Sequence, residues 1–495
     1  MPIMDEPTSL DPQIADSNSE KLVAANCYEG LVRIMADGTI GKGVATDWNI
    51  SDDGLTYTFK LSNNSHWAMF SGHKAVLGEN YEDTFDITVK AEDFKFGIER
   101  TLSEQTGSAD APLFSAVKSI STPDDFTIVF NLSYADDNFL YALTNPGAMP
   151  CDEEFFNLTN GKYGLDAKYL LCNGPFHVSK WTEKTSVKLV KNNEYNGESS
   201  VSPSSVTFYI NNNDSEVADK MNSVTYDVAF LSSSQFSSIE NKKDLNSVAV
   251  QNVTYSFIFN QNDNNYRNKN MRLAFCRSCD TSSLFDSQSD ISKADGIVPP
   301  SCKIGGEDYR NGNAAELLSY DETLAKKNFN DALLELGSSS VETTILCTEQ
   351  YESFVKQMVQ KLQKTLGVKF VSTVKVVSES DLEAAVNDGN YSVAFYPFKA
   401  KSSFAGEIIE GFDQNNIFGY ESDILSQKIR NIKNNSGSLE GERSAVADAE
   451  NYLVSEAVIM PVFYENSYFV TSKKTSGIYF YSSADNVCFI NAKKS

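Results

Sequence analysis

The stretch from residue 45 to residue 67, ATDWNISDDGLTYTFKLSNNSHW, constrains the fold more than any other part of this chain. Its centre, DDG at 52–54, is a turn signal. Beyond the turn, apolar and polar residues alternate from Leu55 to Leu61 in residue types that favour strands. Trp48 and Ile50 precede the turn and supply the partner strand. The stretch therefore predicts an antiparallel β-hairpin.

An amphipathic helix is expected at 91–102. Phe94, Ile98 and Leu102 share one face of it, and two acidic residues lie at its positive N-terminal end. Near the start of the chain, Gly30 is well placed to stop an earlier helix.

Helix and strand patterns alternate in the second half of the chain. Helices are expected at 352–366, 380–387 and 445–455, strands at 369–377 and 391–398, and a flexible loop at 437–441. This rhythm predicts an α/β architecture.

Length and composition limit the class of protein. With 495 residues, 41% of them apolar, the chain can form two or three domain-sized cores and is not disordered. It has no run of 18 apolar residues, so we expect no transmembrane helix. The formal net charge of −25 would repel nucleic acid and anionic membrane surfaces. We therefore expect no nucleic-acid partner.

Eight cysteines are spread along the chain, at positions 27, 151, 172, 276, 279, 302, 347 and 488. Cys276 and Cys279 have the Cys-x-x-Cys spacing of redox and zinc sites. The surrounding MRLAFCRSCD reads as a helix, however, and no second cysteine pair at zinc spacing follows. We expect both on a helix face. Cys151 and Cys172 flank one segment and could pair with each other.

No enzyme motif is evident. The chain has no Gly-x-Ser-x-Gly elbow, Walker loop or His-Glu-x-x-His motif. His66 and His73 are not at a metal-pair spacing, and the paired aspartates at 52–53 lie at a turn. We therefore expect no catalytic residue, no metal and no cofactor. The 31 Phe and 23 Tyr suit a binding protein whose cleft is lined by aromatic rings.

The order of the motifs resembles that of a known family. Ala-x-x-Trp, then Asp-Gly-x-Thr-Tyr-Thr-Phe-x-Leu, then Trp67, is similar to the signature of the extracytoplasmic solute-binding proteins of the oligopeptide/dipeptide/nickel ABC-importer family, family 5. The same resemblance is found in MDEPTSLD at 4–11, YEGLVR at 28–33, NGPF at 173–176, YSFIFN at 255–260 and IMPVFY at 459–464. Ser62 departs from the family, which usually has a basic residue there, and 68–88 looks like an insertion.

The resemblance implies a periplasmic-binding-protein-like fold. That fold is α/β and two-lobed, of class II and the large three-domain type, with a cleft between the lobes. Domain I would be discontinuous and comprise 1–40, 172–257 and 465–495; domain II would be 41–171, and domain III would be 258–464.

The resemblance also implies a function. The chain would be the substrate-binding protein of an ABC transporter. It would capture an extracellular solute, foremost a peptide or peptide-like ligand, by lobe closure and deliver it to the permease subunits. It would be a monomer and not an enzyme. It would be extracytoplasmic, either a surface lipoprotein of a Gram-positive bacterium or periplasmic, and would touch the membrane only through a lipid anchor on a removed N-terminus.

Eight ligand-contacting residues follow from the resemblance: Glu6, Thr8, Ser9, Tyr396, Phe398, Lys401, Phe463 and Tyr464. The first three belong to an opening segment that lines the cleft in relatives. The last two lie where the chain returns from one lobe to the other. The other three belong to the strand that begins at residue 391 and to its continuation.

Lys401 marks a departure from the family. In peptide-binding relatives, a strand like YSVA at 391–394 runs on into Gly-Trp-x-x-Asp, whose Asp holds the α-ammonium group of the ligand. Aligning from residue 391 places Pro397 at the Gly, Phe398 at the Trp and Lys401 at the Asp. A buried lysine would repel an ammonium group. The hypothesis is that this protein takes a blocked peptide, or a ligand with an anionic or neutral polar group at that point.

Two alternatives stay open. The same fold could bind a non-peptide ligand such as a glycoside or a metal chelate, because the family binds all of these. The chain could also be a surface adhesion or sensory protein that has no transport role.

Overall fold

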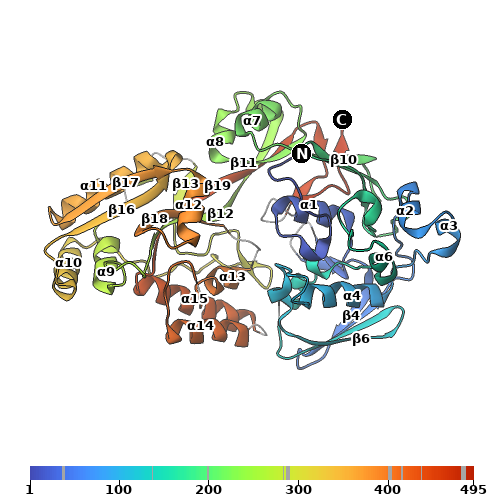
Figure 1. Ribbon diagram of the computed structural model, residues 1–495, viewed down its shortest axis with the longest axis horizontal. Helices are drawn as coiled ribbons and strands as arrows, with labels where there is room; N and C mark the ends of the chain where they lie inside the picture. The colour runs from blue at the N-terminus through green and yellow to red at the C-terminus, as the bar shows by residue number, and fades with distance from the viewer. Residues whose placement is uncertain are drawn as a thin grey trace. The chain divides into compact units, whose positions relative to one another are not determined.

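The computed structural model describes residues 1–35, 39–136, 138–197, 200–281, 284–285, 290–399, 404–413, 416–435, 438–480 and 487–495. These residues form two compact units, one made of Met1–Ala249 with Tyr468–Ser495 and the other of Val250–Ser467. The chain passes between the units inside two long strands, β12 (Leu245–Phe259) and β19 (Ile459–Ser472) (Figure 1). The finer division into three domains stays a prediction.

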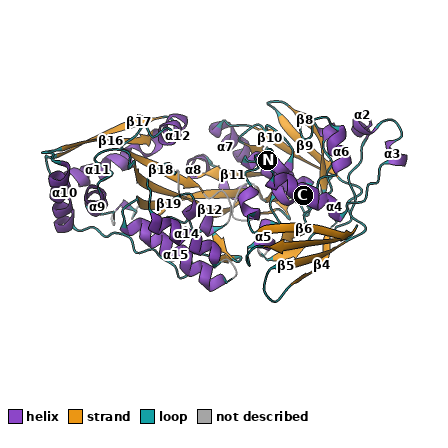
Figure 2. Ribbon diagram, turned by 60° about the horizontal axis from the view of Figure 1, so that its bottom comes forward, coloured by secondary structure: helices purple, strands orange, loops and turns teal. Residues whose placement is uncertain are grey.

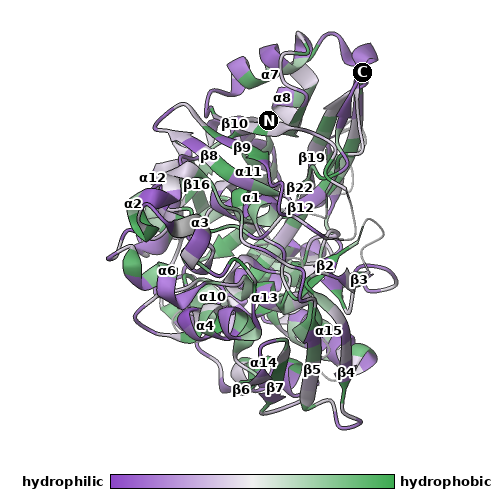
Figure 3. Ribbon diagram, turned by 90° about the vertical axis from the view of Figure 1, so that its right-hand side faces the viewer, coloured by the Kyte–Doolittle hydropathy of each residue, from purple (hydrophilic) through white to green (hydrophobic). Residues whose placement is uncertain are grey.

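A four-stranded antiparallel sheet in the first unit contains the predicted hairpin (Figure 2). Its strands are β4 (Ala45–Ile50), β5 (Thr56–Leu61), β7 (Thr127–Leu132) and β6 (Val117–Asp124), in that order. Trp48 pairs with Phe59, and along β5 apolar and polar residues alternate so that Tyr57, Phe59 and Leu61 are buried. Figure 3 shows β4 and β5 side by side, coloured by hydropathy. Gly54 has a φ of 70° in the turn, a conformation that glycine adopts without strain. The hairpin prediction is confirmed.

Helix α4 (Ala91–Leu102) has the predicted bounds and packs against β6 and β7. Phe94 and Ile98 have no exposed surface, as expected for its apolar face. Leu102 is 36% exposed, and the buried face of the helix ends instead at Thr101, which has no exposed surface.

The second sheet of this unit carries the N-terminal segment. Its strands are β1 (Pro2–Ile3), β10 (Ser205–Ile210), β9 (Ser186–Lys191) and β8 (Phe176–Thr182), in that order, with β1 parallel to β10 and the other pairs antiparallel.

Helix α1 (Asn18–Cys27) lies beside this sheet and ends earlier than predicted. Its C-cap, Tyr28, has extended backbone, so the prediction that Gly30 stops the helix is wrong. A Cβ atom at Gly30 would lie 3.1 Å from the carbonyl oxygens of Leu143 and Val32. A side chain at Gly30 would therefore fit only tightly, so the glycine suits close packing of the chain rather than a turn.

The remaining elements of the first unit are mostly short. The helices are α2 (Lys74–Leu77), α3 (Tyr81–Thr84), α5 (Phe139–Ala142), α6 (Glu153–Leu158), α7 (Asp214–Asn222) and α8 (Ser233–Ser238). The strands are β2 (Val32–Ile34), β3 (Ile40–Lys42), β11 (Val228–Ser232), β20 (Thr475–Ser476), β21 (Tyr479–Phe480), β22 (Val487–Cys488) and β23 (Lys493–Lys494), of which β11 pairs with β19.

The second unit is built on one mixed sheet in the order β19-β12-β18-β16-β17. The strands not yet given are β16 (Val341–Thr348), β17 (Phe370–Val377), β18 (Val393–Lys399), β13 (Ile291–Lys293) on β19, and the separate pair β14 (Lys303–Ile304) and β15 (Glu307–Asp308). β16 is parallel to β17 and β18, whereas β12 is antiparallel to β18.

Helices cover both faces of this sheet. One core contains Phe257 and Phe259 of β12 with residues of α9 (Lys269–Arg277), α10 (Glu322–Leu336) and α11 (Glu352–Leu366). The other contains Ile258 with residues of α12 (Glu379–Asn387), α13 (Ala405–Glu410), α14 (Asp423–Asn434) and α15 (Leu439–Ser455), and Figure 1 shows α14 and α15 lying together. This layering confirms the α/β prediction.

The start of α15 differs from the expectation. A flexible loop was predicted for 437–441, but the helix begins at Leu439. The hydroxyl of Ser438 accepts a hydrogen bond from the Gly441 N–H at 3.1 Å and so caps the first turn. Gly437 lies outside the described residues.

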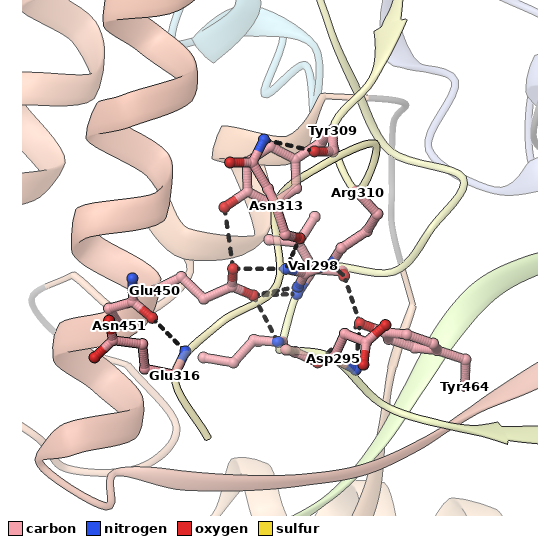
Figure 4. Close-up of polar contacts among 11 residues, drawn as sticks. Asp295, Val298, Tyr309, Arg310, Asn313, Glu316, Glu450, Asn451 and Tyr464 are labelled. Carbon is pink, nitrogen blue, oxygen red and sulfur yellow. Dashed lines mark hydrogen bonds and ion pairs between the residues drawn. The ribbon is translucent and has the colours of Figure 1, made fainter. Parts of the chain in front are cut away.

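A buried glutamate in α15 fixes the irregular segment that follows β13. Glu450 is 1% exposed, and its carboxylate accepts hydrogen bonds from the N–H groups of Ile297 (2.6 Å) and Val298 (2.9 Å) (Figure 4). It also accepts one from the Tyr309 hydroxyl at 3.0 Å and forms an ion pair with Arg310. Arg310 in turn donates from Nε to the Val298 carbonyl at 2.7 Å. One carboxylate thus satisfies donors that no strand or helix partner satisfies.

We expect Glu450→Gln to lower the free energy of unfolding of the second unit by about 3 kcal/mol, because it leaves the buried Arg310 charge uncompensated. Glu322→Gln, which removes an exposed ion pair with Lys326 on α10, is the matched control and should leave stability nearly unchanged. Urea unfolding followed by circular dichroism measures both. Equal midpoints for the two variants would contradict the central role of Glu450.

Candidate functional site

The opening segment of the first unit is held by one carboxylate of α1. Glu20 Oε1 accepts hydrogen bonds from Thr8 N (2.7 Å), Thr8 Oγ1 (2.8 Å) and Ser9 N (3.4 Å). Glu20 Oε2 accepts from Asp16 N (3.0 Å) and Ser17 N (3.2 Å). Burial works against the charged form, but the hydrogen bonds from Asp16, Thr8 and Ser17 outweigh it and lower the pKa of Glu20.

The side chains of the other two predicted residues here are also engaged. Glu6 accepts from Trp181 Nε1 (3.0 Å) on β8 and from Lys184 N (2.6 Å) in the turn that follows. Ser9 is buried and its hydroxyl accepts from Asp11 N at 3.1 Å. The structure therefore brings Glu6, Thr8 and Ser9 together in one ordered stretch.

At Thr8 and Ser9 the main chain is left with hydrogen-bond acceptors but not donors. The N–H groups of Thr8 and Ser9 point to Glu20, whereas within the described ranges no backbone N–H donates to the carbonyl oxygens of these two residues. A partner that meets this stretch would have to supply hydrogen-bond donors.

In the second unit, Tyr396 and Phe398 lie on the same face of β18. Their rings are 5.7 Å apart between centroids, and the Phe398 ring stacks at 5.8 Å on both Phe412 and Phe418. Both predicted residues are partly exposed. They form an aromatic wall that is backed by the core.

The neighbouring strand β12 carries a polar stripe that the sequence reasoning missed. Asn252 Oδ1, Thr254 Oγ1 and Ser256 Oγ are buried and have no hydrogen-bond partner among the described residues. Thr254 lies opposite Phe398 and Ser256 opposite Tyr396, so the stripe and the aromatic wall share one face of the sheet. The signal in the sequence was the polar residue at every second position of NVTYSFIF.

Phe463 and Tyr464 occupy the interior of the second unit. Phe463 has no exposed surface and packs on Tyr255 at 5.0 Å between ring centroids. The Tyr464 hydroxyl donates to the carbonyl oxygens of Gly296 and Val298, both at 3.3 Å, and accepts from Asp295 N at 3.1 Å (Figure 4). A ligand could touch Phe463 only after this core opened, and the ligand role of both residues stays a prediction.

Lys401 lies outside the described residues, together with its neighbours from 400 to 403. The hypothesis that a lysine replaces the ammonium-binding aspartate therefore stays a prediction. The segment resumes at Phe404, which bridges to Lys303.

The described residues contain no cluster of three histidine, cysteine, aspartate or glutamate side chains placed to hold a metal ion. His73 is buried with Nε2 on the Leu170 carbonyl at 3.1 Å, and burial lowers its pKa to about 4. Cys276 lies on α9 as predicted. Cys279 lies beyond the end of that helix, which corrects the helix-face expectation, and its thiol donates to the Met358 carbonyl at 3.9 Å.

Across the parts of the chain that the structure describes, no helix has both the length and the apolar composition needed to span a bilayer.

Comparison with known proteins identifies the family. Residues 39–418 match the family model of bacterial extracellular solute-binding proteins, family 5 Middle. The dipeptide-binding protein DppE of Bacillus subtilis is 24% identical over 496 residues, which cover 96% of this chain and 88% of that protein.

Two solved structures have the same fold. Listeria monocytogenes OppA bound to peptide has a TM-score of 0.77 at 20% identity and covers 100% of this chain and 98% of its own. AgaA of A. tumefaciens R10 in complex with agropinic acid has a TM-score of 0.73 at 17% identity and covers 99% of this chain and 97% of its own. The order of motifs, the α/β layers and the family match agree: this protein belongs to family 5 of the bacterial extracellular solute-binding proteins.

Proposed function

We propose that this protein is the substrate-binding component of an ABC importer, which captures a peptide or peptide-like solute by lobe closure and delivers it to the permease subunits. The observation that carries the proposal is the family match over residues 39–418. DppE, a dipeptide-binding protein, and the peptide-bound OppA support peptides as the class of ligand. Closure would bend the chain at the two strands that join the units, β12 and β19. Such a protein needs no catalytic residue.

The proposed location is extracytoplasmic. The family description, extracellular solute-binding proteins, supports it. The protein would act as a monomer, and a lipid anchor on an N-terminal segment would hold it near its permease. The surface-lipoprotein arrangement of Gram-positive bacteria and a periplasmic one both satisfy this proposal.

The opening segment favours a ligand that is rich in hydrogen-bond donors. The N–H groups of Thr8 and Ser9 are used by Glu20, so only their carbonyl oxygens are free to pair with a ligand. An extended peptide supplies N–H groups at the spacing that main-chain pairing needs. An organic acid or a glycoside offers no such row of N–H donors. Pairing would therefore run from ligand N–H to protein carbonyl.

The polar stripe on β12 is the proposed recognition surface of the second unit. Buried hydroxyls without a partner cost stability unless a ligand or water satisfies them. Thr254 and Ser256 have no exposed surface, so they would hydrogen-bond polar groups of the ligand once that face of the sheet opens, while the partly exposed Tyr396 and Phe398 would contact its apolar parts.

Lys401 favours a second candidate function, in which the same kind of binding protein takes a different class of ligand. Its charge opposes binding of a free ammonium group and favours a ligand that is anionic or blocked at that point. AgaA has the same fold and was solved in complex with agropinic acid, which supports a ligand other than a peptide. A non-peptide ligand is therefore the alternative that the same experiments decide.

The ligand class is tested by calorimetry with free di- to pentapeptides, the same peptides N-acetylated, glycosides and organic acids. We expect micromolar binding of peptides that survives or improves on N-acetylation, because Lys401 gives no partner to an ammonium group. Lys401→Asp should reverse that preference, whereas Lys399→Asp, at the exposed end of β18, should not. Binding lost on acetylation would contradict the role of Lys401. If none of the tested compounds bound, the proposal that the protein transports such solutes would be contradicted.

Glu20→Gln should weaken binding of the best peptide about tenfold. Both carboxylate oxygens of Glu20 accept hydrogen bonds, one from Thr8 and Ser9 and the other from the start of the helix, whereas a glutamine amide has only one oxygen that can accept. The lowered pKa of Glu20 also predicts how the stability of the folded protein changes with pH. The folded state gains stability above the ordinary glutamate pKa and loses it as the pH falls through the lowered value.

The matched control for that variant is Glu216→Gln, which also removes a carboxylate from a first helical turn. Within the described part of the chain, the one ion pair of Glu216 is with Lys220 on the same helix, α7. It should leave affinity unchanged. Equal affinity losses in the two variants would mean that the opening segment does not meet the ligand.

Thr254→Val should lower ligand affinity about tenfold without destabilising the free protein, since the hydroxyl it removes has no partner among the residues that the structure describes. Thr343→Val is the matched control, because the Thr343 hydroxyl is buried and lies 2.9 Å from the Tyr266 hydroxyl. It should cost about 1 kcal/mol of stability and leave affinity unchanged. Calorimetry and thermal unfolding together separate the two outcomes. Unchanged ligand affinity in the Thr254→Val variant would mean that the polar stripe does not contact the ligand.

A further inference from the structure

Two stretches of the first unit meet backbone to backbone at the end of α1. The Gly174 N–H donates to the Cys27 carbonyl at 2.8 Å, and Asn173 exchanges hydrogen bonds with the main chain of Glu29 at 2.8 and 3.1 Å. A Cβ atom at Gly174 would lie 2.6 Å from the Tyr28 nitrogen, so no side chain fits between the stretches. The backbones beside Cys27 and Cys172 are therefore in direct contact.

This contact brings two thiols together. The Cys27 and Cys172 side chains lie close enough to interact electrostatically, and both residues are buried in one core. The other cysteine considered as a partner from the sequence, Cys151, instead lies 3.5 Å from an Arg100 guanidinium nitrogen. All eight cysteines, which lie within the described ranges, are free thiols in the structure.

We propose that Cys27 and Cys172 form an intramolecular disulfide when the protein folds in an oxidising compartment. The Gly174–Cys27 contact holds the chain two residues beyond Cys172 against Cys27, which favours the short separation that a disulfide requires. Disulfides persist in exported proteins, so the inference rests on the proposed extracytoplasmic location. The bond would tie the end of α1 to the residues that lead into β8.

The oxidant is a disulfide, either a small one such as oxidised glutathione or that of an oxidoreductase. One cysteine thiolate attacks the oxidant, forms a mixed disulfide and releases one thiolate of the oxidant. The second cysteine thiolate then attacks the mixed disulfide and releases the other. Two protein thiols lose two protons and two electrons, and the oxidant becomes two thiols.

Burial sets the time at which the bond can form. It holds the pKa of the Cys27 thiol well above its ordinary value, so the folded protein contains almost no reactive thiolate there. Exchange therefore takes place while the chain folds, before the core closes. Once formed, the bond is shielded from reductants. The bond would also restrain the end of α1, the helix in which Glu20 accepts hydrogen bonds from the opening segment.

The test refolds the purified full-length protein in a mixture of oxidised and reduced glutathione, and in dithiothreitol as the reduced reference. Free thiols are alkylated after denaturation, and peptide mapping by mass spectrometry locates any bond. We expect a peptide cross-linked through Cys27 and Cys172. We also expect a melting temperature roughly 5–10 °C higher than that of the reduced protein.

Three variants make the result specific, with the difference between oxidised and reduced melting temperatures as the readout. Cys27→Ser and Cys172→Ser should abolish that difference, and Cys151→Ser should keep it. Eight alkylated cysteines in the oxidised wild-type protein would overturn the inference, as would a bond from Cys172 to Cys151. Ligand binding is not measured, so failure here is distinct from failure of the proposed transport function.

Discussion

Buried backbone N–H groups need acceptors, and in both units of this protein a glutamate side chain supplies them where regular structure does not. Glu20 serves the opening segment and the start of α1. Glu450 serves the segment after β13 and compensates the charge of Arg310. Two irregular stretches thereby become ordered parts of the framework. Each lies beside residues that the family resemblance assigned to the ligand, so the precision of the proposed site depends on these carboxylates.

The strand β12 shows how one element can serve both the core and a binding surface. On one face, Phe257 and Phe259 pack among the helices α9 to α11. On the other, Thr254 and Ser256 are polar and unpartnered among the described residues, although the strand is buried on that side too. A structural strand buried on both faces would carry apolar residues throughout. The polar stripe is therefore better explained by recognition than by packing.

The ligand-contacting residues that the family resemblance implies do not all lie where the structure would let a ligand reach them. Phe463 fills a core position, and Tyr464 joins the network around Glu450. Both are interior residues of β19, the strand that runs from one unit into the other. Tyr396 and Phe398, by contrast, keep exposed surface beside the polar stripe. The second pair is the stronger candidate for direct contact.

The sequence alone determined the local elements, because alternation and helical periodicity report burial of one face at short range. It predicted the hairpin around Gly54, the bounds of α4 and α11, and the order of motifs that indicates the family. It did not show that Cys27 meets Cys172, or that Glu20 and Glu450 hold distant main-chain groups. Those contacts join residues far apart in the chain, and only tertiary packing brings them together. The same reason explains Gly30, whose need for close approach depends on a carbonyl oxygen more than a hundred positions away.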